Sequence, residues 1–122
     1  MQAQIKVTAL PKYEPLHEVQ GAQHVFSYTI IIENLSKETV QLRRRHWFIA
    51  DGDIDDREVE GEGVIGEQPI LEPGESFEYQ SWSPMISEYG SMKGYYTFTT
   101  MNNETFKVEI PQFLLMPDYL LN

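Results

Sequence analysis

Apolar and polar residues alternate along most of the chain with a period of two, which is typical of β-strands that bury one face. The clearest example spans residues 25–33, where Phe26, Tyr28, Ile30 and Ile32 share one face. The same alternation predicts further strands at residues 5–9, 39–50, 57–60, 76–80, 95–100 and 105–110. No window combines the i, i+3, i+4, i+7 spacing of an amphipathic helix with capping residues. The pattern therefore predicts an all-β chain.

The predicted strand at residues 39–50 changes phase along its length. Val40 and Leu42 share one phase, whereas Trp47 and Ile49 have the opposite one. A single extra residue in a strand reverses the phase of everything that follows it. We therefore expect a β-bulge within residues 43–45.

Turn-forming residues separate the predicted strands. Pro11 is expected to end the first strand, because proline cannot donate a hydrogen bond to a ladder. Tight turns are expected at Asp51-Gly52, at Pro73-Gly74 and at the two-residue hairpin turn Asn102-Asn103. The longer connections are expected at residues 61–66 and at residues 81–91, which contain Pro84 and Gly90. Residues 113–116 either continue the last strand or pack over the edge of the sheet.

About seven short strands in 122 residues are typical of an antiparallel β-sandwich of the fibronectin type III or immunoglobulin-like class, in one domain at residues 1–122. The chain has no cysteine, which excludes disulfides, thiolate metal sites and cysteine nucleophiles. It has neither an apolar run of the ~20 residues that a membrane span needs nor a signal-peptide pattern. We therefore expect a cytoplasmic protein with no membrane partner, either a monomer or a weak homodimer.

The acidic charge is concentrated in one part of the sequence. The net charge is −10 at pH 7, and residues 51–78 hold eleven acids but only one base, Arg57. Nucleic-acid binding proteins instead show a basic stripe, because neutralising phosphates supplies most of their affinity. The basic run at residues 43–45 would alternate between the two faces of a strand. We expect no nucleic-acid partner.

Gly61, Gly63 and Gly66 match the G-x-G-x-x-G fingerprint of dinucleotide-binding folds. That fingerprint requires a helix whose first N–H groups meet the pyrophosphate. Prolines at positions 69 and 73 leave no room for such a helix, and the upstream acids would repel phosphates. We expect a glycine-rich turn, with nucleotide or pyrophosphate binding as an alternative.

Four acids match the spacing of a calcium-binding loop. Asp51, Asp53, Asp55 and Glu62 fall at positions 1, 3, 5 and 12 of an EF-hand-like loop. The glycine that the loop needs at position 6 is replaced by Asp56, and strands rather than helices are predicted on both sides. We expect a solvated hairpin tip and no cofactor, with a divalent-cation site as the alternative.

No pattern predicts a catalytic centre. His17 begins an H-E-x-x-H sequence, but Gly21 stands where the second histidine would be. Nothing brings His24 or His46 close to it, and the chain has no G-x-S-x-G elbow. We expect a non-enzymatic protein without catalytic residues.

The loop at residues 81–90 is the best candidate for binding a protein partner. It carries Trp82, Met85, Ile86 and Tyr89, and such residue types are enriched at the centres of protein interfaces. Loops of this length are often functional. The alternative is that the loop folds back and buries these side chains.

A series of segments resembles the ApaG family, in order and over nearly the whole chain. The segments are residues 26–30 (FSYTI), 33–35 (ENL), 40–42 (VQL), 45–47 (RHW), 58–69 (EVEGEGVIGEQP), 73–75 (PGE), 90–95 (GSMKGY) and 110–113 (IPQF). This chain departs from the family at Trp82, where glycine is common, and at residues 87–89.

The resemblance implies a fibronectin type III-like β-sandwich. Related domains in F-box proteins and in a DNA-polymerase-interacting protein look like protein-interaction modules. Bacterial members are associated with cobalt resistance and magnesium efflux and are encoded near a diadenosine tetraphosphate hydrolase, and their biochemical role is not settled. In the family, the glycine motif has been interpreted as a pyrophosphate site.

Overall fold

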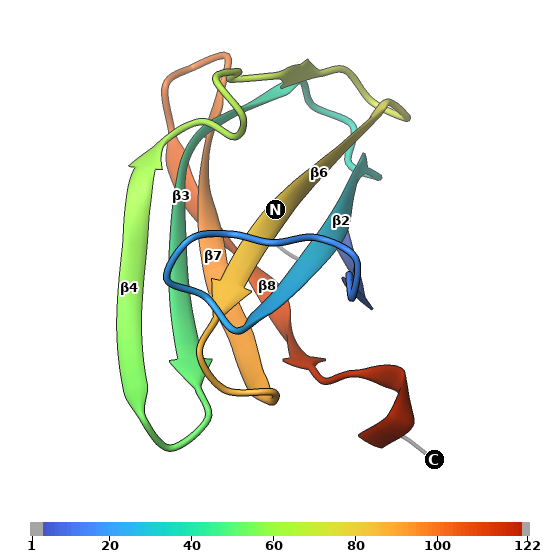
Figure 1. Cartoon of the computed structure of the whole chain (residues 1–122). Coiled ribbons are helices and arrows are strands. Elements are labelled where there is room, and N and C mark those ends of the chain that lie inside the picture. Colours follow the sequence, from blue (N-terminus) through green and yellow to red (C-terminus); the bar gives the residue numbers. More distant parts are fainter. Residues whose placement is uncertain (1–3, 121–122) are drawn as a thin grey trace.

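The computed structural model describes residues 4–120, which fold into eight β-strands and a short C-terminal 3-10 helix (Figure 1). The elements are β1 (Ile5–Tyr13), β2 (His24–Asn34), β3 (Val40–Asp51), β4 (Asp55–Glu62), β5 (Ile70–Leu71), β6 (Ser76–Met85), β7 (Gly90–Thr100), β8 (Thr105–Leu115) and η2 (Asp118–Leu120). Residues 1–3 and 121–122 of the predicted domain lie outside this part. Within it, no helix has the length and apolar character that crossing a bilayer requires.

The strands form two antiparallel sheets that pack face to face. The smaller sheet has the order β1-β2-β6. The larger has the order β4-β3-β7-β8, and the two-residue strand β5 pairs with the beginning of β3. The predicted antiparallel β-sandwich is therefore confirmed.

The core lies between the two sheets, where the period-two alternation places the large apolar side chains. Phe26, Ile30 and Ile32 of β2 are fully buried, and they face Tyr96 and Phe98 of β7, which are equally buried. Burying side chains of this size stabilises a fold by roughly 1.5–3 kcal/mol each. The alternation read from the sequence thus identifies the inner face of both central strands.

The predicted bulge in β3 is confirmed. The register of β3 against β7 shifts between Leu42 and Arg44, so Arg43 is the extra residue. After the shift, Trp47 and Ile49 point into the core, and His46 and Phe48 point outward. The bulge therefore sets which side chains of β3 lie on the outer surface of the larger sheet.

Two expectations based on proline were wrong. Pro11 does not end β1, which continues to Tyr13, and Pro84 lies within β6, which continues to Met85. Both prolines lie on edge strands, where the missing N–H leaves no ladder hydrogen bond unmade. The predicted long loop at residues 81–91 is consequently a four-residue turn, 86–89, between β6 and β7.

The β7–β8 hairpin is present, but its turn is displaced by one residue. The N–H of Asn103 donates to the Thr100 carbonyl, which places Met101 and Asn102 at the centre of the turn. Asn103 itself adopts a left-handed conformation, with a φ of 62°. Asparagine tolerates that conformation better than most residues. The left-handed Asn103 therefore allows a turn that is longer than the predicted two-residue turn.

Candidate functional site

Two turns lie side by side at one end of the sandwich, and a buried carboxylate joins them (Figure 1). One turn, residues 52–54, connects β3 to β4, and the other, residues 86–89, connects β6 to β7. Asp51 is only 1% exposed and accepts hydrogen bonds from the N–H groups of Ile86 and Ser87 at 2.9 and 2.8 Å. The Tyr89 hydroxyl adds a bond to Asp53 at 2.9 Å. The two turns are therefore held as one unit.

The environment of Asp51 favours its charged form. Burial alone would raise the pKa of this carboxyl group, but the hydrogen bonds from Ile86 and Ser87 and the nearby Arg57 guanidinium outweigh burial and lower the pKa below its ordinary value. Arg57 lies 3.4 Å from the carboxylate and also donates to the Pro84 carbonyl at 2.9 Å. Arg57 thus links β4 to the end of β6.

We expect Asp51→Asn to lower the free energy of unfolding at pH 7 by about 2 kcal/mol. The amide keeps one acceptor oxygen, so one of the two turn N–H groups loses its partner. Because the folded-state pKa of Asp51 is lowered, its contribution is complete above the unfolded value of about 4 and is lost as the pH falls through the folded value. Urea unfolding from pH 7 to pH 3 should show the variant and wild type converging.

The matched control for that comparison is Asp55→Asn, which changes an exposed acid near the same turn. It should leave stability within about 0.5 kcal/mol of wild type at every pH. An Asp51→Asn protein that stays equally far from wild type between pH 7 and pH 3 would contradict the assigned role of the carboxylate.

The structure separates the four residues predicted to bind a partner. Met85 is 1% exposed in the core, because β6 continues to this position and its alternation points Met85 inward, so Met85 cannot contact a partner. Trp82 lies on the outer side of β6, and its ring centroid is 4.8 Å from that of His17. Ile86 and Tyr89 remain at the β6–β7 turn, and all three are between 43% and 45% exposed.

One exposed apolar residue at this end was missed by the sequence reasoning. Ile54 lies in the β3–β4 turn and is 66% exposed. Its signal in the sequence is a branched apolar residue between Asp53 and Asp55 in a predicted turn, where a polar residue is usual. We call Ile54, Ile86 and Tyr89 the tip surface.

The four acids of the calcium-loop spacing do not come together. Asp51 is buried, and Asp55 lies opposite it in the strand register at one end of β4. Glu62 lies opposite Arg44 at the other end of β4, seven residues and therefore about 23 Å from Asp55. Among residues 4–120, no group of three or more histidine or acidic side chains is arranged to hold a metal ion.

The glycine motif forms the end of β4 and a tight turn, with no helix after it. Gly61 lies in β4 beside the Arg45 guanidinium, which donates to the carbonyls of Glu62 and Gly63 at 3.0 Å. Gly63 and Gly66 have φ values of 62° and 79°. The N–H of Gly63 donates to the Arg43 carbonyl, and Val64 and Glu67 bond to each other. These backbone groups are engaged within the protein, as in a structural turn.

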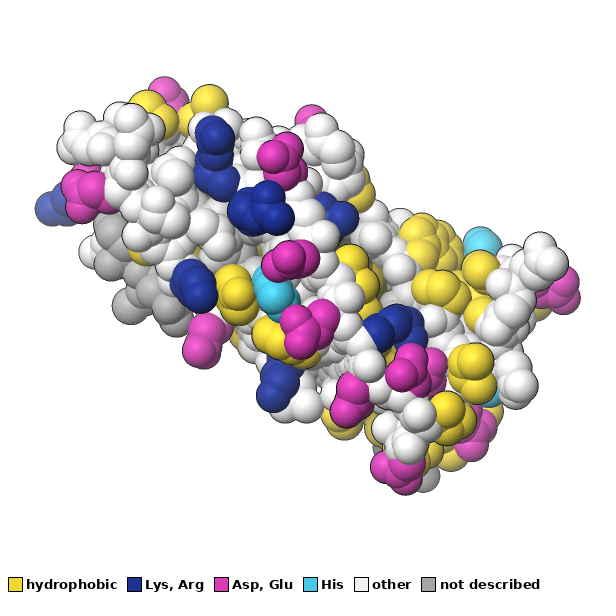
Figure 2. Space-filling model, turned by 90° about the vertical axis from the view of Figure 1, so that its left-hand side faces the viewer, with side chains coloured by type: hydrophobic (Ala, Val, Ile, Leu, Met, Phe, Trp, Pro, Cys, Tyr) yellow, Lys and Arg dark blue, Asp and Glu magenta, His cyan; other side chains and the backbone are white. Residues whose placement is uncertain are grey.

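A cluster of aromatic and charged side chains covers the outer face of the larger sheet (Figure 2). The ring of His46 stacks on Tyr95 with centroids 5.0 Å apart and lies 4.6 Å from Phe48. Its two nitrogens lie 2.9 Å from a Glu58 oxygen and 3.1 Å from a Glu60 oxygen. The Nδ1 atom also lies 3.3 Å from the Tyr95 hydroxyl. The bulge at Arg43 creates this surface by turning His46 and Phe48 outward.

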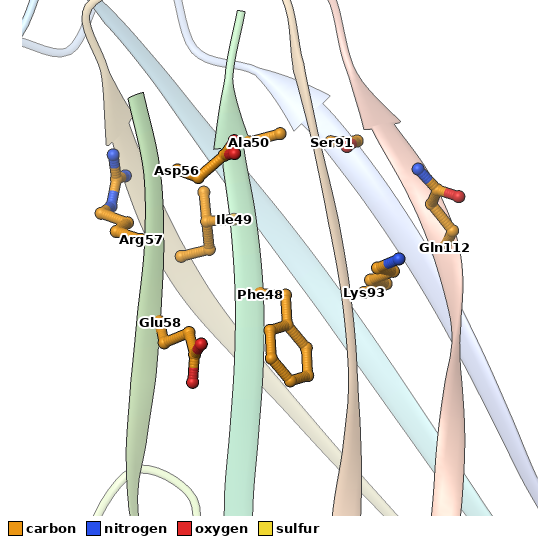
Figure 3. Close-up of a pocket in the computed structure, with 9 residues that line it drawn as sticks. All are labelled: Phe48, Ile49, Ala50, Asp56, Arg57, Glu58, Ser91, Lys93 and Gln112. Atoms are coloured by element: carbon orange, nitrogen blue, oxygen red, sulfur yellow. The ribbon is translucent and has the colours of Figure 1, made fainter. Parts of the chain in front are cut away.

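Beside this cluster the outer face is hollowed, with a volume of about 470 Å³ (Figure 3). Phe48 and Ala50 of β3 lie at its centre. Asp56 and Glu58 of β4 lie on one side. The remaining lining residues include Ser91, Lys93 and Gln112 of β7 and β8. Arg57 points away from the others, toward the core side of β4, where it contacts Asp51. None of the residues of this hollow was predicted to form a site from the sequence.

Comparison with known proteins places this fold and these motifs in a family. The ApaG domain matches residues 15–100. The chain belongs to the ApaG family. It is 46% identical to the ApaG protein of Xanthobacter autotrophicus over 116 residues, which cover 93% of this chain and 89% of that protein. It is also 46% identical to the ApaG protein of Rhodopseudomonas palustris over 112 residues, or 91% of this chain and 86% of that protein.

Solved structures agree with that assignment. A putative ApaA protein from Bordetella pertussis superposes with a TM-score of 0.88 at 40% identity, covering 93% of this chain and 94% of that one. An X-ray structure from the Northeast Structural Genomics Consortium superposes with a TM-score of 0.92 at 32% identity, covering all of this chain and 93% of that one. The resemblance to the ApaG family seen in the sequence is therefore confirmed.

Proposed function

We propose that this ApaG-family protein is a non-enzymatic, cytoplasmic interaction module, monomeric or weakly dimeric, that binds a protein partner through the tip surface. The observation that carries the proposal is the group of exposed apolar side chains on turns that Asp51 holds together. Surfaces fixed before binding lose less conformational entropy when a partner docks. Tyrosine is also among the residues that contribute most at interface centres.

The other functional alternatives have less support. The spacing of Asp51 and Glu62 argues against the alternative of a cation-binding loop, and the engaged backbone of the glycine motif argues against a pyrophosphate cradle. Asp51 is a buried carboxylate whose two oxygens already contact three structural partners, which argues against a role in acid–base work. We propose that the family's association with cobalt resistance and magnesium efflux acts through the bound partner.

Affinity purification from a lysate of the source organism tests this proposal. The double variant Ile86→Ser/Tyr89→Ala should lose the partner that wild type captures, because it removes both anchors on one turn. Trp82→Ala, made separately, asks whether the outer side of β6 extends the same contact. Leu35→Ser is the matched control, since Leu35 is also an exposed aliphatic residue but lies at the opposite end of the sandwich.

Each variant's melting temperature must first show that it is folded. Loss of a captured protein with the double variant but not with Leu35→Ser supports the tip surface. If folded Ile86→Ser/Tyr89→Ala protein retained every protein captured by wild type, the tip surface would not be the binding site.

A further inference from the structure

The hollow on the outer face has walls of opposite charge. The strand register places Glu58, Phe48 and Lys93 in one row across β4, β3 and β7. The next row toward the tip holds Asp56, Ala50 and Ser91. Acids therefore line the β4 side, a lysine and an amide line the β7 and β8 side, and an aromatic ring lies between them (Figure 3).

Two of the charged side chains in this hollow, Asp56 and Lys93, are not neutralised by a neighbouring side chain, whereas one oxygen of Glu58 contacts His46. Within residues 4–120, the side chains of Asp56, Lys93 and Gln112 have no hydrogen-bond or ion-pair partner. Elsewhere on the same face the charges are engaged: Glu60 contacts His46, and the Lys107 ammonium lies 4.5 Å from the centre of the Tyr95 ring. The hollow thus differs from its surroundings in offering a free anion and a free cation on opposite walls.

The spacing of the walls defines the shape of a fitting ligand. Neighbouring strands lie about 4.8 Å apart, so the acidic strand β4 and the lysine strand β7 are about 10 Å apart across β3. A fitting ligand has a cation at one end, a carboxylate at the other and an aliphatic stem that lies on Phe48. Lysine at the C-terminus of a polypeptide has these three parts, because its side chain separates the ammonium from the terminal carboxylate.

We propose that the hollow binds the C-terminal lysine of a partner polypeptide. The ammonium meets Asp56 and the free oxygen of Glu58, the stem packs on Phe48, and the terminal carboxylate meets Lys93 and the Gln112 amide. The inference rests on the proposed function in one respect, that the ligand belongs to a protein partner. The hollow also borders the tip surface, because Ala50 and Ser91 directly adjoin Asp51 and Gly90 at the end of β3 and β7.

Peptide binding measured by fluorescence anisotropy tests the assignment. The probe is a hexapeptide of glycine and serine that carries an N-terminal fluorophore and ends in lysine. Three further ligands isolate the recognised groups: the C-terminal amide of the same peptide, the peptide with norleucine in place of lysine, and free lysine as a competitor. We expect the amide and the norleucine peptide each to bind about tenfold more weakly, because each leaves a charged wall unpaired.

Variants of the protein assign each wall to one end of the ligand. With Lys93→Gln, the acid and amide peptides should bind equally, while the preference for lysine over norleucine is kept. With Asp56→Asn, the preference for lysine should fall and the preference for the acid over the amide should remain. Phe48→Ala should weaken binding of every peptide. Lys12→Gln and Glu78→Gln, exposed positions on the smaller sheet, are the matched controls and should bind as wild type does.

Three results would overturn the assignment. The first is no binding of the lysine peptide at millimolar protein, and the second is an unchanged acid-over-amide preference in Lys93→Gln. The third is equal affinity for free lysine and for the peptide, which would show that the site takes the amino acid itself rather than a chain terminus. The tip variant Ile86→Ser/Tyr89→Ala should bind the short peptide normally. A negative result for the tip surface in the affinity purification can therefore be distinguished from a negative result for the hollow in the peptide-binding experiment.

Discussion

Replacing Gly63 with alanine is expected to lower the free energy of unfolding by about 3 kcal/mol. A Cβ atom at this position would lie 2.2 Å from the Glu67 carbonyl oxygen and 2.9 Å from its carbon. That carbonyl cannot move away easily, because it accepts the N–H of Val64 at 2.8 Å. The φ of 62° adds the left-handed strain that an alanine would carry. The measurement is urea unfolding at pH 7 followed by far-UV circular dichroism.

Gly66→Ala is the matched control for this prediction. Gly66 has a similar φ of 79°, but nothing lies within 4 Å of where its Cβ would be. Backbone strain alone should therefore lower the free energy of unfolding of this variant, by about 1 kcal/mol. Equal losses for the two variants would show that the close approach to Glu67 has no energetic weight. Because the role of Gly63 is steric, the difference between the variants should not change when saturating ATP is added.

The period-two pattern predicted most of the fold because it reports directly on burial. The alternation at Phe26, Ile30 and Ile32 identified β2, and the phase change between Leu42 and Trp47 identified the bulge in β3. Both predictions depend only on side chains within one strand. Pro11 and Pro84 misled the interpretation because their effect depends on strand order, which a single strand does not reveal.

The candidate site was harder to predict because it depends on contacts between distant residues. Met85 was predicted to be a loop residue, but β6 continues past Pro84 and its alternation places the Met85 side chain in the core. Nothing in the sequence distinguishes Asp51 from the other ten acids of its segment, although its carboxylate accepts hydrogen bonds from two N–H groups of a turn 35 residues later. The row of Glu58, Phe48 and Lys93 needs the register of three strands. Residue type and spacing along the chain do not specify that register.

Asn34→Asp is expected to destabilise the fold by about 3 kcal/mol or more at pH 7, although it changes only one side-chain group. Asn34 is fully buried at the end of β2. Its amide nitrogen donates to the carbonyls of Glu38 and Leu71 at 2.8 and 2.9 Å, while its oxygen accepts from Ser36. A carboxylate would face the first two carbonyls with an oxygen instead of a donor, and its charge would be buried without a cation.

The pH dependence of that loss separates charge from shape. Burial and the two carbonyl oxygens should raise the folded-state pKa of the introduced carboxyl group above its unfolded value of about 4. The penalty is then complete above the folded pKa and shrinks as the pH falls through it, because a protonated carboxyl group can donate to one of the two carbonyls. Urea unfolding of wild type and variant at pH 7, 5 and 4 should show the difference between their free energies of unfolding narrowing.

Asn102→Asp, in the exposed β7–β8 turn, controls for the added charge and should follow wild type throughout. A loss for Asn34→Asp that stayed constant over this range would mean that burial of the introduced charge is not what destabilises the variant.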